Sequence, residues 1–170
     1  MADYKQALQE GFAAAEKANS ARKEIEDVLA KFKSDLLEAS DGKLLVEVRQ
    51  YEEKEEEGSI LATPTLAQLY ARRLQPKKYY KAIIAVNPKS EKNSVKQLAV
   101  WGQAKGGYPC SVSFGKQEFQ CENRAGLEEA LAEMLKDPAI GEKLYLLAQL
   151  NGRLLSAELM TMRLSHNNCA

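Results

Sequence analysis

The sequence predicts an α+β protein with a long N-terminal helix, an antiparallel sheet of about five strands with one inserted helix, and a helical C-terminus. Residues 2–39 are rich in the helix formers Ala, Glu, Lys and Leu and contain no proline. The stretch 44–121 contains short runs with the alternation or the apolar character of strands, and helical spacing returns after residue 123. We expect two parts: the long helix over 1–40, for packing or oligomerisation, and an α+β globular domain over 41–170.

The N-terminal helix carries an apolar seam. With Leu8 at heptad position a, the a and d positions are mostly apolar or small, and Gly11 and Arg22 are the weak points. A straight helix over this stretch would be roughly 57 Å long at about 1.5 Å per residue, more than a compact domain of this size can cover. The helix therefore either breaks or finds a partner chain, and we favour a homo-oligomer formed through residues 4–39.

The next stretch is expected to form one strand and one helix. Residues 40–42 read as a turn, and the alternation over 44–51 predicts a strand. The glutamate-rich run 52–57 indicates a solvated loop or a fraying strand end. A short helix is expected over 64–75, because Pro64 follows a threonine that can cap its first turn.

Four further strands are expected between residues 79 and 121. The run 79–87 is apolar on both faces, which is typical of a central strand, and 95–102 is the next strand. Gly106-Gly107 is expected to be a flexible connection to a hairpin. In that hairpin, Gly115-Lys116 fits a two-residue type II′ turn, which places Cys110 opposite Cys121 on the apolar face.

The C-terminal part predicts three helices. Asn123 is a suitable N-cap for a helix that reaches Lys136, and Asp137-Pro138 starts a second helix that runs to about Leu150. A third amphipathic helix is expected over roughly 154–164, followed by a tail.

Composition excludes several classes of protein. The chain has 45% hydrophobic and 28% charged residues, which is typical of a folded domain. We expect no signal peptide, no membrane span and no membrane partner, because the apolar runs are only a few residues long. Three cysteines do not suggest a disulfide framework, so a cytoplasmic protein is expected.

The main functional signal is a basic and aromatic middle. The chain has a formal net charge of zero, yet residues 59–109 contain nine basic side chains and one acidic side chain. Lysine and arginine attract phosphates, and flat rings stack on bases, so this mixture suits single-stranded nucleic acid. The residues expected to bind it are Arg72, Arg73, Lys77, Lys78, Tyr79, Tyr80, Lys81 and Trp101, within a surface that spans residues 70–108.

Two other interpretations of this stretch stay open. In the first, Trp101 and one of the paired tyrosines belong to the core and the lysines are merely solvated or offset the acidic loop. In the second, the protein is a protein–protein regulator or inhibitor whose basic face meets an acidic partner. We therefore expect a non-enzymatic binding or adaptor protein.

Metal sites and catalysis receive little support from the sequence. Cys110, Cys121, His166 and Cys169 could in principle form a zinc site, but the two hairpin cysteines lie on an apolar face and no C-x₂-C pair is present. Asp41 and Glu47 loosely resemble the acids of a metal-dependent nuclease, although arginine stands where a lysine base would be needed. No phosphate-binding glycine loop occurs. We expect no cofactor, no metal and no catalytic residue.

Overall fold

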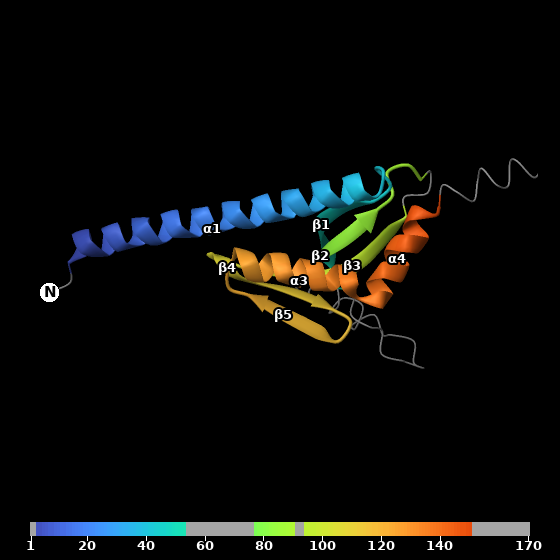
Figure 1. The fold of residues 1–170 in the computed structure, drawn as a ribbon. Coiled ribbons are helices and arrows are strands. Elements are labelled where there is room, and N and C mark those ends of the chain that lie inside the picture. The colour runs from blue at the N-terminus through green and yellow to red at the C-terminus, as the bar shows by residue number, and fades with distance from the viewer. Residues whose placement is uncertain (1–2, 54–76, 91–93, 151–170) are drawn as a thin grey trace, which may run out of the picture.

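The computed structural model describes residues 3–53, 77–90 and 94–150, and it confirms the α+β architecture with a long N-terminal helix (Figure 1). The described elements, in chain order, are α1 (Tyr4–Ala39), β1 (Leu45–Glu52), β2 (Tyr79–Val86), β3 (Val95–Ala104), β4 (Gly107–Phe114), β5 (Gln117–Cys121), α3 (Arg124–Lys136) and α4 (Pro138–Ala148). The helices expected over 64–75 and 154–164 lie outside the described residues. None of the described helices combines the length and apolar character that a membrane span requires.

The sheet is an antiparallel meander in which each strand pairs with the next along the chain. The strand order is β1-β2-β3-β4-β5, so β2 is internal, as its doubly apolar sequence predicted. The predicted hairpin register is confirmed, because Cys110 pairs with Cys121 and Phe114 pairs with Gln117. Gly115 has a φ of 58°, which the first position of the predicted type II′ turn requires.

The connection between β3 and β4 is tighter than expected. A two-residue turn at Lys105 and Gly106 joins the strands, and Gly107 is already the buried first residue of β4. Its φ of 99° is one that side chains rarely adopt, and an added Cβ would lie 2.7 Å from the Cβ of Ala21. Gly107 therefore permits the close approach of α1 to β4, instead of forming part of a flexible linker.

The main core lies between the sheet and the three described helices. It contains Ile25 and Val28 of α1, Leu127 and Met134 of α3, and Leu147 of α4, all buried. These residues recur at the helical spacing that places them on one face of each helix. On the sheet, the core side chains are Val46, Ile83, Ala85, Leu98, Ala99, Trp101, Cys110, Val112, Phe114 and Cys121. The opposite sheet face holds a smaller buried cluster of Ala82, Ile84 and Val86, with Tyr51 and Tyr80 packed against it.

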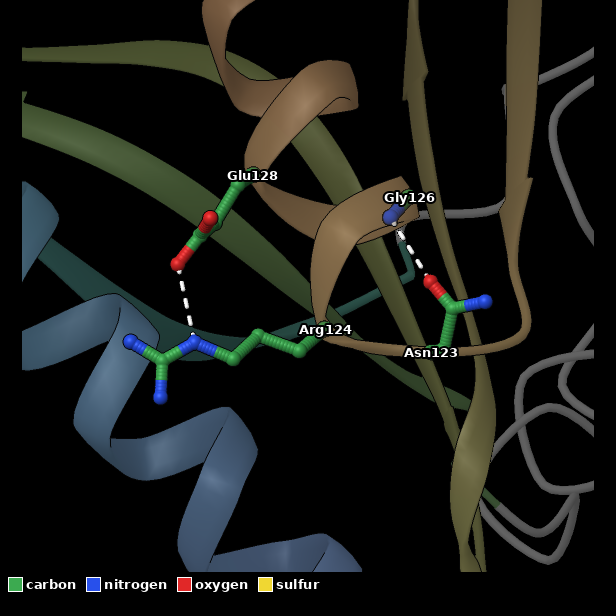
Figure 2. Close-up of polar contacts among 4 residues, drawn as sticks. All are labelled: Asn123, Arg124, Gly126 and Glu128. Atoms are coloured by element: carbon green, nitrogen blue, oxygen red, sulfur yellow. Dashed lines mark hydrogen bonds and ion pairs between the residues drawn. The ribbon is translucent and has the colours of Figure 1, made fainter.

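Side-chain caps fix where the C-terminal helices begin. Asn123 accepts a hydrogen bond from the backbone N–H of Gly126 at 2.9 Å, and Arg124 forms an ion pair with Glu128 at 3.0 Å (Figure 2). Asp137 caps α4 in the same way, by accepting bonds from the N–H groups of residues 139 and 140. Both helix starts agree with the caps that the sequence predicts.

A buried asparagine joins the sheet to α4. Asn87, which follows β2, donates from Nδ2 to the carbonyl oxygen of Leu147 at 2.9 Å. Its Oδ1 accepts a bond from the N–H of Lys89 at 2.9 Å. Both ends of this buried amide are therefore satisfied, as the burial of a polar side chain requires.

Only the second half of α1 packs against the rest of the described fold. Ile25 and Val28 are buried, and Leu29, Phe32 and Leu36 pack against the core. In contrast, every residue from Asp3 to Lys17 is exposed. Figure 1 shows this half of α1 extending past the sheet and α3. We call residues 4–17 the overhang of α1.

Candidate nucleic-acid interface

The antiparallel order brings several lysines of the central stretch to one end of the sheet. Lys77 and Lys78 precede β2, Lys81 lies near its start, and Lys105 occupies the turn after β3. Because neighbouring strands run in opposite directions, the start of β2 lies beside the end of β3, and Lys81 pairs with Trp101 in the register. We call the end of the sheet that carries these four lysines its basic end.

Two other cations of the same stretch lie elsewhere. Lys89 follows the end of β2 and Lys96 lies near the start of β3, at the opposite end of the sheet. Lys89 donates to the carbonyl oxygen of Asp41 at 2.5 Å. The structure therefore divides the described cations of the basic middle between two ends. Arg72 and Arg73 lie outside the described residues.

Tyr79 and Lys81 share one side of β2, as alternation along the strand predicts. Tyr79 is 57% exposed, and Lys81 is exposed as well. Lys81 also borders a depression of about 390 Å³ whose wall is part apolar and part polar. Its lining residues are Leu29, Val48, Arg49, Gln50, Lys81, Trp101 and Gln103.

The charge of Lys77 is matched within the chain. Its Nζ lies 3.0 Å from Oε1 of Glu52, at the end of β1. The hydrogen bond to Glu52, together with the negative charge of this carboxylate, raises the pKa of Lys77 above its usual value. Both side chains are well exposed to solvent. A phosphate can therefore compete with this carboxylate for Lys77 at little cost.

Tyr80 lies on the other side of β2 and already has partners. Its ring stacks on that of Tyr51, with centroids 5.9 Å apart. Its hydroxyl donates to Oε1 of Gln97 at 3.2 Å. Tyr80 is half-buried, so its ring packs against the sheet and is less available than that of Tyr79 for stacking on a base.

Trp101 is part of the core. It is only 4% exposed and lies on the sheet face that the helices cover. It lines part of the depression, but at this low exposure its ring has no open face on which a base could stack. This placement fits the interpretation in which Trp101 is a packing residue.

Arg22 was not among the residues that the sequence predicts for the interface. It extends from α1 to the β3–β4 turn, where its Nε donates to the carbonyl oxygen of Lys105 at 3.1 Å and its Nη2 donates to the same oxygen. Its Nη1 donates to Oδ1 of Asn19 at 2.9 Å. The available signal was its position, because a charged residue at heptad position a interrupts an apolar seam.

The two hairpin cysteines are free thiols that face each other in the core. Both are buried, on the sheet face that α3 covers. Burial raises the pKa of Cys110 to about 12, with the neighbouring Cys121 as a smaller cause. Burial also raises the pKa of Cys121. Thiols held protonated in this way are poor metal ligands and poor nucleophiles. The other two members of the expected zinc set, His166 and Cys169, lie outside the described residues.

The acids of the loosely nuclease-like pattern are arranged as surface residues. Glu47 accepts a hydrogen bond from Nε of Arg49 at 2.9 Å, two residues further along the same strand. Asp41 lies in the turn before β1 with a φ of 51°. Within the described part of the chain, no group of three His, Cys, Asp or Glu side chains is placed to hold a metal ion.

Comparison with known proteins found no matching family model, no similar curated protein and no similar solved structure.

Proposed function

We propose that this protein is a non-enzymatic binding protein that holds single-stranded nucleic acid at the basic end of its sheet. The observation that carries the proposal is the exposure of Lys78, Tyr79 and Lys81 at one end of β2, beside a depression with a mixed wall. Phosphate attraction requires such lysines, and base stacking requires an exposed ring.

In this proposal each exposed group has a separate role. Lys78 and Lys81 contact phosphates, and Tyr79 stacks on a base. Gln50 and Gln103 line the depression. In the proposal their side-chain amides donate to and accept from the edge of a base that enters it. Trp101 and Tyr80 support the surface from the sheet, and Lys77 binds a further phosphate when it leaves Glu52.

Fluorescence anisotropy with a labelled single-stranded oligonucleotide tests the proposal. We expect Lys78→Ala/Lys81→Ala to weaken binding and to reduce the slope of log K against log salt by about 0.7 for each phosphate that is no longer neutralised. The matched control is Lys89→Ala/Lys96→Ala, which removes the same charge from the opposite end of the sheet. Equal weakening in the two double variants would contradict a site at the basic end.

A second candidate is an acidic protein partner. The ion pair between Lys77 and Glu52 favours it, because a lysine at this end of the sheet already binds a carboxylate of the same chain. The variant Tyr79→Leu distinguishes the two candidates. Loss of stacking should weaken oligonucleotide binding by about 1–3 kcal/mol, whereas attraction to a polyglutamate chain should persist. Unchanged oligonucleotide binding by Tyr79→Leu would favour the acidic partner.

The proposal also includes self-association through α1. The apolar residues of its second half contact the core, whereas the overhang carries exposed Tyr4, Leu8 and Phe12. A homo-oligomer would cover these side chains and would place at least two basic ends on one particle. Two linked sites bind one long strand more tightly than either site alone, provided that the strand can span them.

A further inference from the structure

Three large apolar side chains form a ridge on the overhang of α1. Tyr4 is 84% exposed, Leu8 is 56% exposed and Phe12 is 61% exposed. Their spacing of four residues places them in one row along the helix. Tyr4 and Leu8 lie on the heptad seam, which continues with the small residues Gly11, Ala15 and Ala18. An exposed apolar stripe of this kind is typical of an interaction surface.

The described fold of the same chain does not cover this ridge. α1 is one unbroken helix from Tyr4 to Ala39, so the ridge cannot fold back onto its own second half. The described body begins to meet α1 near Ala21, where Gly107 makes its close approach. The overhang therefore stands clear of the sheet and of α3 and α4.

We infer that a second copy of this chain covers the ridge, and that the two overhangs pair in antiparallel orientation. In the register that we propose, Leu8 lies opposite Ala18 of the partner subunit, and Gly11 lies opposite Ala15 of the partner subunit. This inference rests on the proposed self-association and adds its orientation and register to it.

The sizes of the seam residues favour this arrangement. In an antiparallel pair, an a residue of one helix meets a d residue of the other. Leu8 then meets an alanine, and Gly11 meets an alanine, so neither of these layers opposes two large side chains. Phe12 flanks the seam near the two-fold axis, where Phe12 of the partner subunit approaches it and fills the space beside the small layers. A parallel pair would instead set Leu8 against Leu8 of the partner subunit and Gly11 against Gly11 of the partner subunit, which would alternate wide and narrow layers.

Charge favours the same orientation. In the antiparallel register, Arg22 lies opposite Tyr4 of the partner subunit, where its guanidinium can rest on the aromatic ring. Arg22 is already held in place by its hydrogen bonds to Lys105 and Asn19. In a parallel pair, Arg22 would face Arg22 of the partner subunit across the seam, and the two like charges would repel each other.

The position of the body limits the register. The partner helix would begin opposite Arg22, where α1 contacts the β3–β4 turn. If the partner helix were shifted by one more heptad, its first helical turn would collide with the β3–β4 turn and the sheet. The overlap therefore covers residues 4–22, which are the overhang and about one further turn of α1.

The buried area predicts a reversible dimer. Tyr and Phe side chains each bury roughly 150–250 Å² when they are fully covered, so two overhangs would bury on the order of 1,000 Å² in total. This value lies at the lower limit for a specific interface, so the equilibrium should depend on protein concentration in an accessible range.

Sedimentation equilibrium on the full chain tests the association. We expect wild type to interconvert between monomer and dimer, and Leu8→Ser to weaken the dimer at least about tenfold. Leu146→Ser is the matched control, because Leu146 is an exposed apolar residue of α4 at 48% exposure, and it should leave the equilibrium unchanged. A wild type that stays monomeric, or two serine variants that behave alike, would overturn both the pairing and the self-association through α1.

Cross-linking tests the orientation and the register separately. Lys5→Cys and Asn19→Cys flank the seam, and each is introduced into a Cys169→Ser background, in which the remaining Cys110 and Cys121 are buried. With a short bis-maleimide, a mixture of the two variants should form a cross-linked heterodimer, and each variant alone should not. In a parallel pair these positions would lie about 21 Å apart along the helix axis, which the reagent does not span. A dimer that sediments as expected but forms no mixed cross-link would overturn the register and leave the self-association standing.

Discussion

Burial decides the chemistry of the two hairpin cysteines. Cys110 and Cys121 pair across the β4–β5 hairpin and lie in the core, where a thiolate would be poorly solvated. The pKa of Cys110 is raised from its ordinary value of 9.0 to about 12 for this reason. These thiols are therefore packing residues with a pH-dependent contribution to stability.

The first prediction concerns alkaline pH. Because the folded pKa of Cys110 is raised, its contribution to the free energy of unfolding is fully present below about pH 9 and is lost as the pH rises toward about 12. In that window the unfolded chain releases protons that the folded chain keeps, so the free energy of unfolding falls by at most about 1.4 kcal/mol per pH unit for this thiol.

Urea unfolding at a series of alkaline pH values measures this slope. The comparison variant is Cys110→Ala/Cys121→Ala, which removes both thiols and should show a flatter decline from about pH 9 upward. Parallel curves for wild type and variant would show that the thiols do not titrate differently in the folded and unfolded chains.

At the scale of single residues, the sequence predicts the side of a strand on which a side chain lies but not whether that side chain is buried. Alternation along a strand predicts that Tyr79 and Lys81 share one side and Tyr80 lies on the other, and the structure has them so. Alternation does not reveal which side a helix covers, nor how far along the strand the cover extends. Trp101 lies beside Lys81 in the register, yet the first is buried and the second is exposed. The difference comes from the packing of helices that are distant in the sequence.

At the scale of elements, the contact between α1 and β4 depends on one glycine. An added Cβ at Gly107 would lie 2.7 Å from Ala21 Cβ and 3.1 Å from the backbone nitrogen of Arg22. Its φ of 99° is also unfavourable for any other residue. The position of α1 on the sheet, and with it the direction of the overhang, therefore depends on this residue.

The second prediction follows from that contact. We expect Gly107→Ala to lower the free energy of unfolding by about 2–4 kcal/mol, because it combines backbone strain with overpacking. Gly141→Ala in α4 is the control, since an added Cβ there meets nothing within 4 Å. It should stabilise the protein by about 0.5–1 kcal/mol, as alanine usually does in place of glycine in a helix. Chemical denaturation of both variants checks the pair, and a similar effect in both would contradict the close approach.

Elements fixed by local chemistry could be predicted from the sequence. The β4–β5 hairpin has its turn and its alternation within a dozen or so residues, so its register follows from the turn at Gly115. The starts of α3 and α4 follow from Asn123 and Asp137, whose side chains cap them. The β3–β4 turn was missed because its tightness depends on α1, which packs against it from far along the chain.

At the scale of the whole molecule, the fold separates charges that the sequence places in one stretch. The central stretch has nine basic side chains and one acidic one along the chain. The meander places Lys77, Lys78, Lys81 and Lys105 at one end of the sheet and Lys89 and Lys96 at the other. Strand direction, which is a property of the topology, thus decides which lysines can act together. The sequence could indicate a basic surface but could not delimit it.

The long helix shows the same limit at this scale. Its length and heptad pattern predict that it exceeds the rest of the domain, and α1 is indeed unbroken, with a first half that the described part of the chain leaves exposed. Which residues remain exposed depends on where the sheet ends beneath it. Tyr4, Leu8 and Phe12 can be identified as exposed only when the structure shows that the sheet begins to contact α1 near Ala21.

Nuclear magnetic resonance on ¹⁵N-labelled protein tests the proposed function most directly, by titration with a single-stranded oligonucleotide at moderate salt. Binding at the basic end should shift the backbone amide signals of Lys78, Tyr79, Lys81 and Lys105, while those of Lys89 and Lys96 stay in place. Signals that remain unchanged at the basic end, or that move only at the opposite end of the sheet, would contradict the account.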